Sequence, residues 1–104
     1  MSKSRGITQM TFLRKLAQER PCMVRLPGVC CFDNSTTVLA HVRLPGVSGM
    51  GIKSPDLVAS WACHECHSAV DRRSHTDLDR DYVRLAHLEG MARTINELAK
   101  EGLL

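Results

Sequence analysis

The chain has 104 residues, a formal net charge of +3 at pH 7, five cysteines and few aromatic residues, namely one Trp, one Tyr and two Phe. This length predicts one domain over residues 1–104 with a mostly aliphatic core. No stretch approaches the roughly 18 apolar residues of a membrane span, and no apolar signal-peptide segment follows the polar residues 1–6. We therefore expect a cytoplasmic protein whose cysteines bind metal rather than form disulfides. The mildly basic charge suits a nucleic-acid partner.

The first part of the chain predicts a basic arm, a helix and a turn. Residues 1–7 are expected to form a flexible basic arm. Residues 8–20 predict a helix that Pro21 ends, because the residue before a proline avoids helical backbone angles. Residues 22–31, CMVRLPGVCC, hold a turn at Pro27-Gly28 and predict either a hairpin or a looped knuckle.

The middle of the chain predicts a strand followed by a glycine-rich loop. Residues 32–36 have the composition of a turn, and residues 37–42 predict a strand because they are apolar and β-branched. His41 lies late in this strand, where a lone histidine is by default a structural residue. The glycine-rich residues 48–53 lack the spacing of a phosphate-binding loop. The apolar residues 57–62 lead into the cysteine-rich segment.

The last part of the chain predicts a polar loop and a long helix. The loop spans residues 72–81, and Asp77 or Asp79 is expected to cap a helix from Arg80 to Glu101. We expect His75 in the loop and His87 on the helix surface. Apolar residues recur along the helix at steps of three and four, at Leu85, Leu88, Ala92, Ile95 and Ala99. This stripe is expected either to supply core or to form a homodimer face.

The cysteines have the pattern of a structural zinc site. Cys63 and Cys66 are separated by two residues, which lets both sulfurs bind one ion. Structural zinc takes four ligands. The remaining ligands are expected upstream, from Cys22 with Cys30 or Cys31, and Cys30 is favoured over its neighbour.

A second pair of metal-binding side chains follows directly. His67 and Asp71 are four residues apart, so they share one face of a helix. Two alternatives stay open at this point. His67 would serve the zinc site in place of Cys30, or Asp71 would pair with Arg72 or Arg73.

Taken in order, these segments resemble the HNH nuclease motif. In that motif, a ββα-metal core carries a general-base histidine at the end of its first strand and a metal-binding histidine after the last cysteine. The resemblance implies an α+β fold, with a small HNH-like core and a structural zinc knuckle between an N-terminal helix and a long C-terminal helix. It also implies a zinc ligand set of Cys22, Cys30, Cys63 and Cys66.

The chain resembles still more closely the YbcO family of small prophage-encoded proteins, which are regarded as HNH-like nucleases. The matching phrases are RKLAQERPCMVRLPGVC, TTVLAHVRLPG, GIKSPDL, ACHECHSAVDRR and LEGMART, spread over nearly the whole chain. The resemblance implies a metal-dependent DNA endonuclease. His41 would be the general base, and His67 with Asp71 would bind Mg²⁺ or another divalent metal.

Three arginines flank the expected site and are expected to grip DNA phosphates: Arg43, Arg72 and Arg73. Two residues depart from the HNH pattern, in which a metal ligand precedes the base histidine and an asparagine precedes the second cysteine pair. Ala40 and Asp56 stand at these positions. Ala40 favours an alternative function, that of a non-catalytic, zinc-stabilised DNA-binding or adaptor protein of phage DNA metabolism. His41 and His67 together favour the nuclease.

Overall fold

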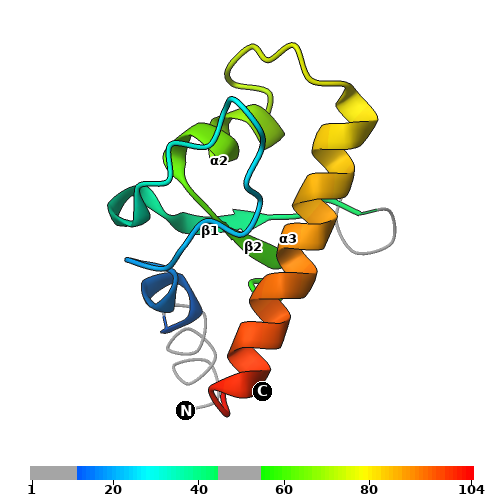
Figure 1. Ribbon diagram of the computed structural model, residues 1–104. Coiled ribbons are helices and arrows are strands. Elements are labelled where there is room, and N and C mark those ends of the chain that lie inside the picture. Colours follow the sequence, from blue (N-terminus) through cyan, green and yellow to red (C-terminus); the bar gives the residue numbers. More distant parts are fainter. Residues whose placement is uncertain (1–11, 45–54) are drawn as a thin grey trace.

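A computed structural model describes residues 12–44 and 55–104 of the chain. Besides a helical segment at residues 12–16, its elements are the 3-10 helix η1 (Asn34–Thr36), strands β1 (Val38–His41) and β2 (Ala59–Ala62), and helices α2 (His64–Val70) and α3 (Arg80–Lys100). In Figure 1, α3 runs along one side of the molecule, and the strands and α2 lie beside it. This arrangement confirms the expected α+β class.

The strands β1 and β2 pair in antiparallel fashion, with Leu39 opposite Trp61 and His41 opposite Ala59. Because successive side chains of a strand point to opposite faces, Leu39 and Trp61 lie on one face of the sheet, and Ala40 and Ala62 lie on the other. The strand expected at residues 37–42 is therefore present but is one residue shorter at each end.

Each face of the sheet meets a separate group of buried side chains in the described chain. One group surrounds the cysteines and consists of Cys22, Val24, Leu26, Ala40, Ala62, Cys63, Cys66, Ala69, Val83 and Ala86. The other surrounds the fully buried Trp61 and adds Ala17, Met23 and Leu98. The sheet thus links a cysteine-centred core to an indole-centred core, and both cores reach α3.

Helix α3 begins as expected, since the Asp79 carboxylate accepts hydrogen bonds from the backbone N–H groups of Asp81 and Tyr82. The expected buried stripe, however, is wrong. Leu85 is 55% exposed, and the face that packs inward carries Val83, Ala86, His87, Gly90, Thr94 and Leu98.

Small and polar residues face the sheet because the contact is close and the strands supply hydrogen-bonding groups. The His87 Nε2–H group donates to the Ala40 carbonyl oxygen at 3.0 Å, which corrects the expectation of a surface histidine. The backbone N–H group of Trp61 donates to Thr94 Oγ1, also at 3.0 Å. Two side chains of α3 therefore fix its position along both strands.

The first helix ends earlier than expected. Residues 12–16 are helical, a turn follows, and Glu19 has a positive φ of 65°, so the helix does not continue to Arg20. Arg20 instead pairs with Glu101 at the end of α3 and stacks over Trp61, with its guanidinium carbon 4.9 Å from the ring centroid. Within residues 22–31 no strand forms, so the looped knuckle is right and the hairpin is wrong.

The expected arm at residues 1–7, the start of the first helix and the glycine-rich residues 48–53 lie outside the described residues. Within the described ranges, none of the helices has the combination of length and apolar character needed to cross a bilayer.

Gly90 provides a test of the close packing of α3. A Cβ atom at this position would lie 3.0 Å from the Met23 carbonyl oxygen and 3.1 Å from Val24 Cγ2. Met23 cannot retreat easily, because its N–H donates to the Trp61 carbonyl and its own carbonyl accepts from Arg93. We expect Gly90→Ala to lower the free energy of unfolding, since overpacking costs about 1–3 kcal/mol against a gain of about 1 kcal/mol in helix propensity.

The matched control is Asn96→Ala, which also improves helix propensity but lies on an exposed part of α3. Thermal unfolding of both variants checks the prediction. A melting temperature of Gly90→Ala equal to or above that of Asn96→Ala would contradict the close contact.

Candidate metal centre and active site

The clearest candidate metal centre is a group of four cysteines, Cys22, Cys30, Cys63 and Cys66. Their sulfur atoms all lie within 4.8 Å of one another, and the Sγ atoms of Cys63 and Cys30 are 3.7 Å apart. Tetrahedral zinc with Zn–S bonds of about 2.3 Å requires S–S separations of about 3.8 Å. The group could therefore hold a metal ion and is compatible with structural zinc.

Local backbone structure directs these sulfur atoms inward. Cys63 is the N-cap of α2, and its Sγ accepts a hydrogen bond from the Cys66 N–H at 3.5 Å. In the upstream loop, Cys22 Sγ accepts from the Arg25 N–H at 3.4 Å, where Arg25 has a positive φ of 53°. The same kind of N–H···S contact thus supports one sulfur of each half of the group.

The electrostatics of the group favour a bound cation. A hydrogen bond from the Cys66 thiol lowers the pKa of Cys22 to about 4, and the same contact raises the pKa of Cys66. Burial raises the pKa of the Cys30 thiol to about 12. These opposed shifts arise because four adjacent sulfurs cannot all ionise together unless a positive charge lies among them.

The structure also separates the two candidates in the upstream loop. Cys30 belongs to the four-sulfur group, whereas Cys31 is exposed and lies with its Sγ 3.6 Å from Thr36 Oγ1. His67 is not a member of the group either. The geometry therefore favours Cys30 over both alternatives as the fourth ligand.

His41 lies at the end of β1 and is held by Asp56. The His41 Nε2 atom is 2.7 Å from Asp56 Oδ1, and the side chain of Asp56 is only 3% exposed. Arg14 approaches the same carboxyl group, with its Nε atom 3.3 Å from Oδ2. As a carboxylate, Asp56 accepts the Nε2 hydrogen of His41, which leaves Nδ1 as a hydrogen-bond acceptor. Asp56, which stands where the HNH pattern has an asparagine, thus orients His41, the candidate base.

His67 and Asp71 come together as their spacing predicted. The His67 Nε2 atom is 3.1 Å from Asp71 Oδ2. Arg73 contacts both side chains, with its Nη2 atom 3.1 Å from His67 Nδ1 and 3.4 Å from Asp71 Oδ2. Burial is the main cause that lowers the pKa of His67, while Asp71 opposes this shift and Arg73 adds to it. A neutral imidazole and a carboxylate therefore converge on a cationic group.

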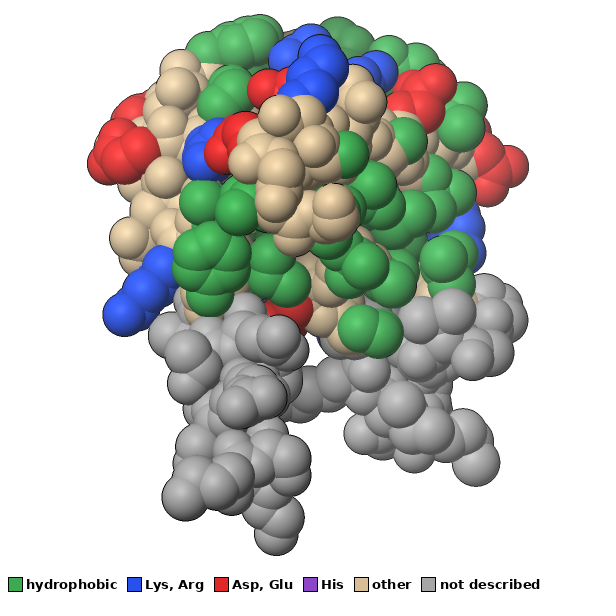
Figure 2. All heavy atoms as spheres, turned by 90° about the horizontal axis from the view of Figure 1, so that it is seen from below, with side chains coloured by type: hydrophobic (Ala, Val, Ile, Leu, Met, Phe, Trp, Pro, Cys, Tyr) green, Lys and Arg blue, Asp and Glu red, His purple; other side chains and the backbone are tan. Residues whose placement is uncertain are grey.

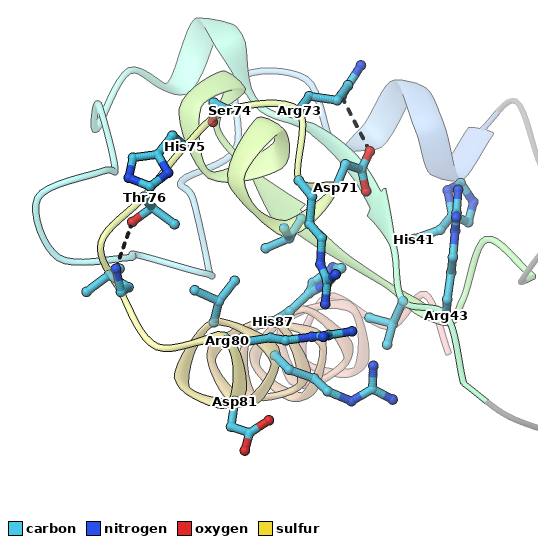
Figure 3. Close-up of a pocket in the computed structure, with 16 residues that line it drawn as sticks. His41, Arg43, Asp71, Arg73, Ser74, His75, Thr76, Arg80, Asp81 and His87 are labelled. Atoms are coloured by element: carbon cyan, nitrogen blue, oxygen red, sulfur yellow. Dashed lines mark hydrogen bonds and ion pairs between the residues drawn. The ribbon is translucent and has the colours of Figure 1, made fainter.

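His41 and Asp71 both line a cleft of about 1070 Å³, whereas His67 does not contribute to its lining. Figure 3 shows His41 and Arg43 from the end of β1, Asp71 from the end of α2, and Arg80 and His87 from α3 around it. Among the described residues, its charged lining consists of the aspartates Asp71 and Asp81 and the arginines Arg43, Arg72, Arg73, Arg80 and Arg84. The sequence predicted roles for Arg43, Arg72 and Arg73 but not for Arg80 and Arg84. The four-residue spacing of Arg80 and Arg84 along α3 was the signal that could have found them.

The histidines of this region differ in their surroundings. His87 is buried at the cleft, and burial is the main cause that lowers its pKa. His75 lies in the loop, as expected, and lines the cleft, but its Nε2 atom is 3.1 Å from Asp77 Oδ1 at the exposed surface. His64 on α2 is exposed.

The face seen from below differs from the arginine-lined cleft. In Figure 2, hydrophobic and uncharged side chains cover most of the described surface of this face, and charged ones are scattered. Elsewhere in the described chain, the apolar side chains of Phe12 and Leu104 are 47% and 59% exposed.

Comparison with known proteins gives a consistent set of relatives. A family model described as "Putative nuclease YbcO" matches residues 11–103. A protein of the same name from Escherichia coli strain K12 is 50% identical over 95 residues, which are 91% of this chain and 98% of that protein. A protein named "Putative nuclease ybcO" from Enterobacteria phage 82 matches with the same identity and the same coverage.

A solved structure is also similar. It is described as "Structure of a putative bacteriophage protein from Escherichia coli str. K-12 substr. MG1655" and has a TM-score of 0.73 and 46% sequence identity. The match covers 88% of this chain and all of that one.

The adjacent cysteines allow a matched test of the metal centre. We expect Cys30→Ser to lose bound metal and to unfold at a lower temperature, because one of the four ligands of a structural metal is removed. Cys31→Ser, one residue away and exposed, should retain both properties. Elemental analysis of the purified proteins and thermal unfolding measure the two outcomes. Loss of metal from Cys31→Ser, with retention by Cys30→Ser, would reverse the assignment.

Proposed function

Because the chain belongs to the YbcO family, whose matching members carry the name "Putative nuclease" and include a phage protein, we propose that it is a metal-dependent endonuclease that hydrolyses DNA phosphodiester bonds. The observation that carries this proposal is the oriented His41, held by Asp56, beside an arginine-lined cleft. The order of β1, β2 and α2 supports an HNH-like ββα-metal core.

In this proposal His41 is the general base. Its ring is fixed through Nε2 by the buried carboxylate of Asp56, so Nδ1 is the nitrogen that takes a proton from water. The His41 side chain is 31% exposed, which gives water access to the ring. The hydrogen bond from His87 to the Ala40 carbonyl fixes the strand at the preceding residue.

His67 and Asp71 would hold the catalytic cation. The contacts of the Arg73 guanidinium with both side chains support a donor pair suited to positive charge. Mg²⁺ or another divalent metal bound there supplies electrostatic stabilisation to the leaving oxygen. The neutral form of His67, favoured by burial, keeps a nitrogen lone pair available.

Zinc is the proposed ion of the four-cysteine site, with a structural role. Four thiolates leave no open coordination position for a substrate or water. Since Cys63 and Cys66 flank the first turn of α2, the ion would order the helix that carries His67 and Asp71. The structural site thereby positions the catalytic one.

DNA is the proposed partner, and its phosphates would contact Arg43, Arg72 and Arg73. The protein would act in the cytoplasm as a single domain, residues 1–104. A homodimer is proposed through α3, because residues of the stripe that faces away from the sheet, such as Leu85, keep apolar surface in contact with solvent.

A second candidate function is a zinc-stabilised DNA-binding or adaptor protein without catalytic turnover. The observation that favours it is the contact of Arg73 with both His67 and Asp71, which already neutralises the carboxylate. Ala40, fully buried, supplies no metal ligand at the position where the HNH motif has one.

A plasmid assay distinguishes the two candidates. We expect the protein to nick supercoiled plasmid in the presence of Mg²⁺ or Mn²⁺, and His41→Ala to lower the rate by about 10²–10⁴-fold, because a general base is lost. His64→Ala is the control, since His64 is exposed on α2 and does not line the cleft. Metal content and melting temperature verify the fold of both variants.

The outcomes lead to different conclusions. An unchanged rate for His41→Ala would remove His41 as the base. Absence of cleavage by the wild-type protein with either metal, while DNA is still bound, would favour the non-catalytic candidate.

A further inference from the structure

We propose that Arg80 and Arg84 form a second phosphate-binding position, on the first two turns of α3, for a DNA backbone phosphate next to the one at the His41 site. The inference rests on the proposed function in taking DNA as the ligand. It adds two residues outside the phrases that carry the family resemblance and extends the expected contact from the loop after α2 onto α3.

The first support is geometric. Arg80 and Arg84 are four residues apart on α3, so they lie on one face of the helix, and both line the cleft that also contains His41 and Asp71. In Figure 3, Arg80 extends from α3 into the same space as His87. Arg84 lines the same cleft as the buried His87.

The second support is the pairing of arginines in the described ranges. Ion pairs with carboxylates hold the side chains of Arg14, Arg20 and Arg73. Hydrogen bonds to backbone carbonyl oxygens hold those of Arg25 and Arg93. In contrast, residues 12–44 and 55–104 provide no ion pair or side-chain hydrogen bond for four arginines, which are Arg43, Arg72, Arg80 and Arg84. All four line the one cleft. The described arginines whose side chains lack such contacts are therefore concentrated where a polyanion would enter.

The chemistry of these side chains selects phosphate. A guanidinium presents several N–H donors in a plane that matches two phosphate oxygens, and Arg is favoured over Lys in such contacts. Repulsion between neighbouring guanidinium groups is relieved when an anion lies between them. Two arginines spaced by one helical turn, such as Arg80 and Arg84, can contact one phosphate from two sides.

The size and lining of the cleft indicate a backbone rather than a base. Its volume of about 1070 Å³ lies at the upper limit of small-molecule pockets, which are about 300–1000 Å³, so it has room for more than one phosphate. No Phe, Tyr or Trp contributes to the lining in the described chain, whereas sites that hold single strands typically stack bases on such rings. We infer contacts to successive phosphates of a duplex, independent of base sequence.

Salt-dependent DNA binding tests the inference. The probe is a short fluorescein-labelled DNA duplex, measured by fluorescence anisotropy without divalent metal, so that binding is separated from cleavage. Each phosphate contact contributes about 0.9 to the slope of log K against log salt concentration. We expect the double variant Arg80→Gln, Arg84→Gln to lower that slope by about 1.8 and to bind more weakly at low salt.

The matched control is Lys15→Gln, Lys100→Gln, which removes the same charge from exposed residues outside the cleft. It should keep the wild-type slope. Arg80 and Arg84 are exposed, and unchanged melting temperatures would verify the folds. If the double variant is unstable, each single variant should lower the slope by about 0.9.

A slope and affinity equal to those of the lysine control would overturn the inference. Its failure can be separated from failure of the nuclease proposal. Plasmid nicking with an unchanged slope in the arginine variant would support the nuclease and remove the second phosphate position. A reduced slope without nicking by the wild-type protein would support the phosphate position and remove the nuclease.

Discussion

The convergence of four cysteine sulfurs is the constraint on which the other features depend. Cys22 and Cys30 come from an upstream loop that forms no strand, and Cys63 and Cys66 border the first turn of a seven-residue helix. A helix of this length is marginal by itself. A metal ion among the sulfurs would tie the loop to α2 and complete the core on one face of the sheet. His67 and Asp71, which project from α2, are positioned by the same contacts.

Polar contacts made by other elements complete the candidate site. Asp56 fixes the His41 ring, and His87 on α3 binds the carbonyl of the preceding residue. Gly90 and Thr94 let α3 approach the sheet closely, so the arginines at the start of α3 face the same cleft as His41. The proposed chemistry therefore depends on long-range contacts between β1, α2 and α3, and not on one local motif.

The sequence predicted those parts whose signal is local. The spacing of Cys63 and Cys66, the four-residue step to Asp71 and the capping of α3 by Asp79 all depend on nearby residues. The predicted buried face of α3 was wrong. The spacing of apolar residues carries no information about the close packing of α3 on the sheet, or about the hydrogen bonds that His87 and Thr94 make there. The contact of Asp56 with His41 joins residues 15 positions apart and depends on the tertiary fold. The role of Asp56 could therefore not be predicted from the neighbouring sequence.

The central claim is that His41 activates water for attack on a DNA phosphodiester bond. The most direct measurement is mass spectrometry of the strands cleaved from a defined DNA duplex, by protein with intact bound metal and added Mg²⁺, in oxygen-18-labelled water. The account predicts one labelled oxygen in the terminal phosphate of the phosphate-ended fragment, no label in the hydroxyl-ended fragment, and loss of product with His41→Ala. Cleavage without incorporation of the label, or labelled product at the wild-type rate from the variant, would contradict it.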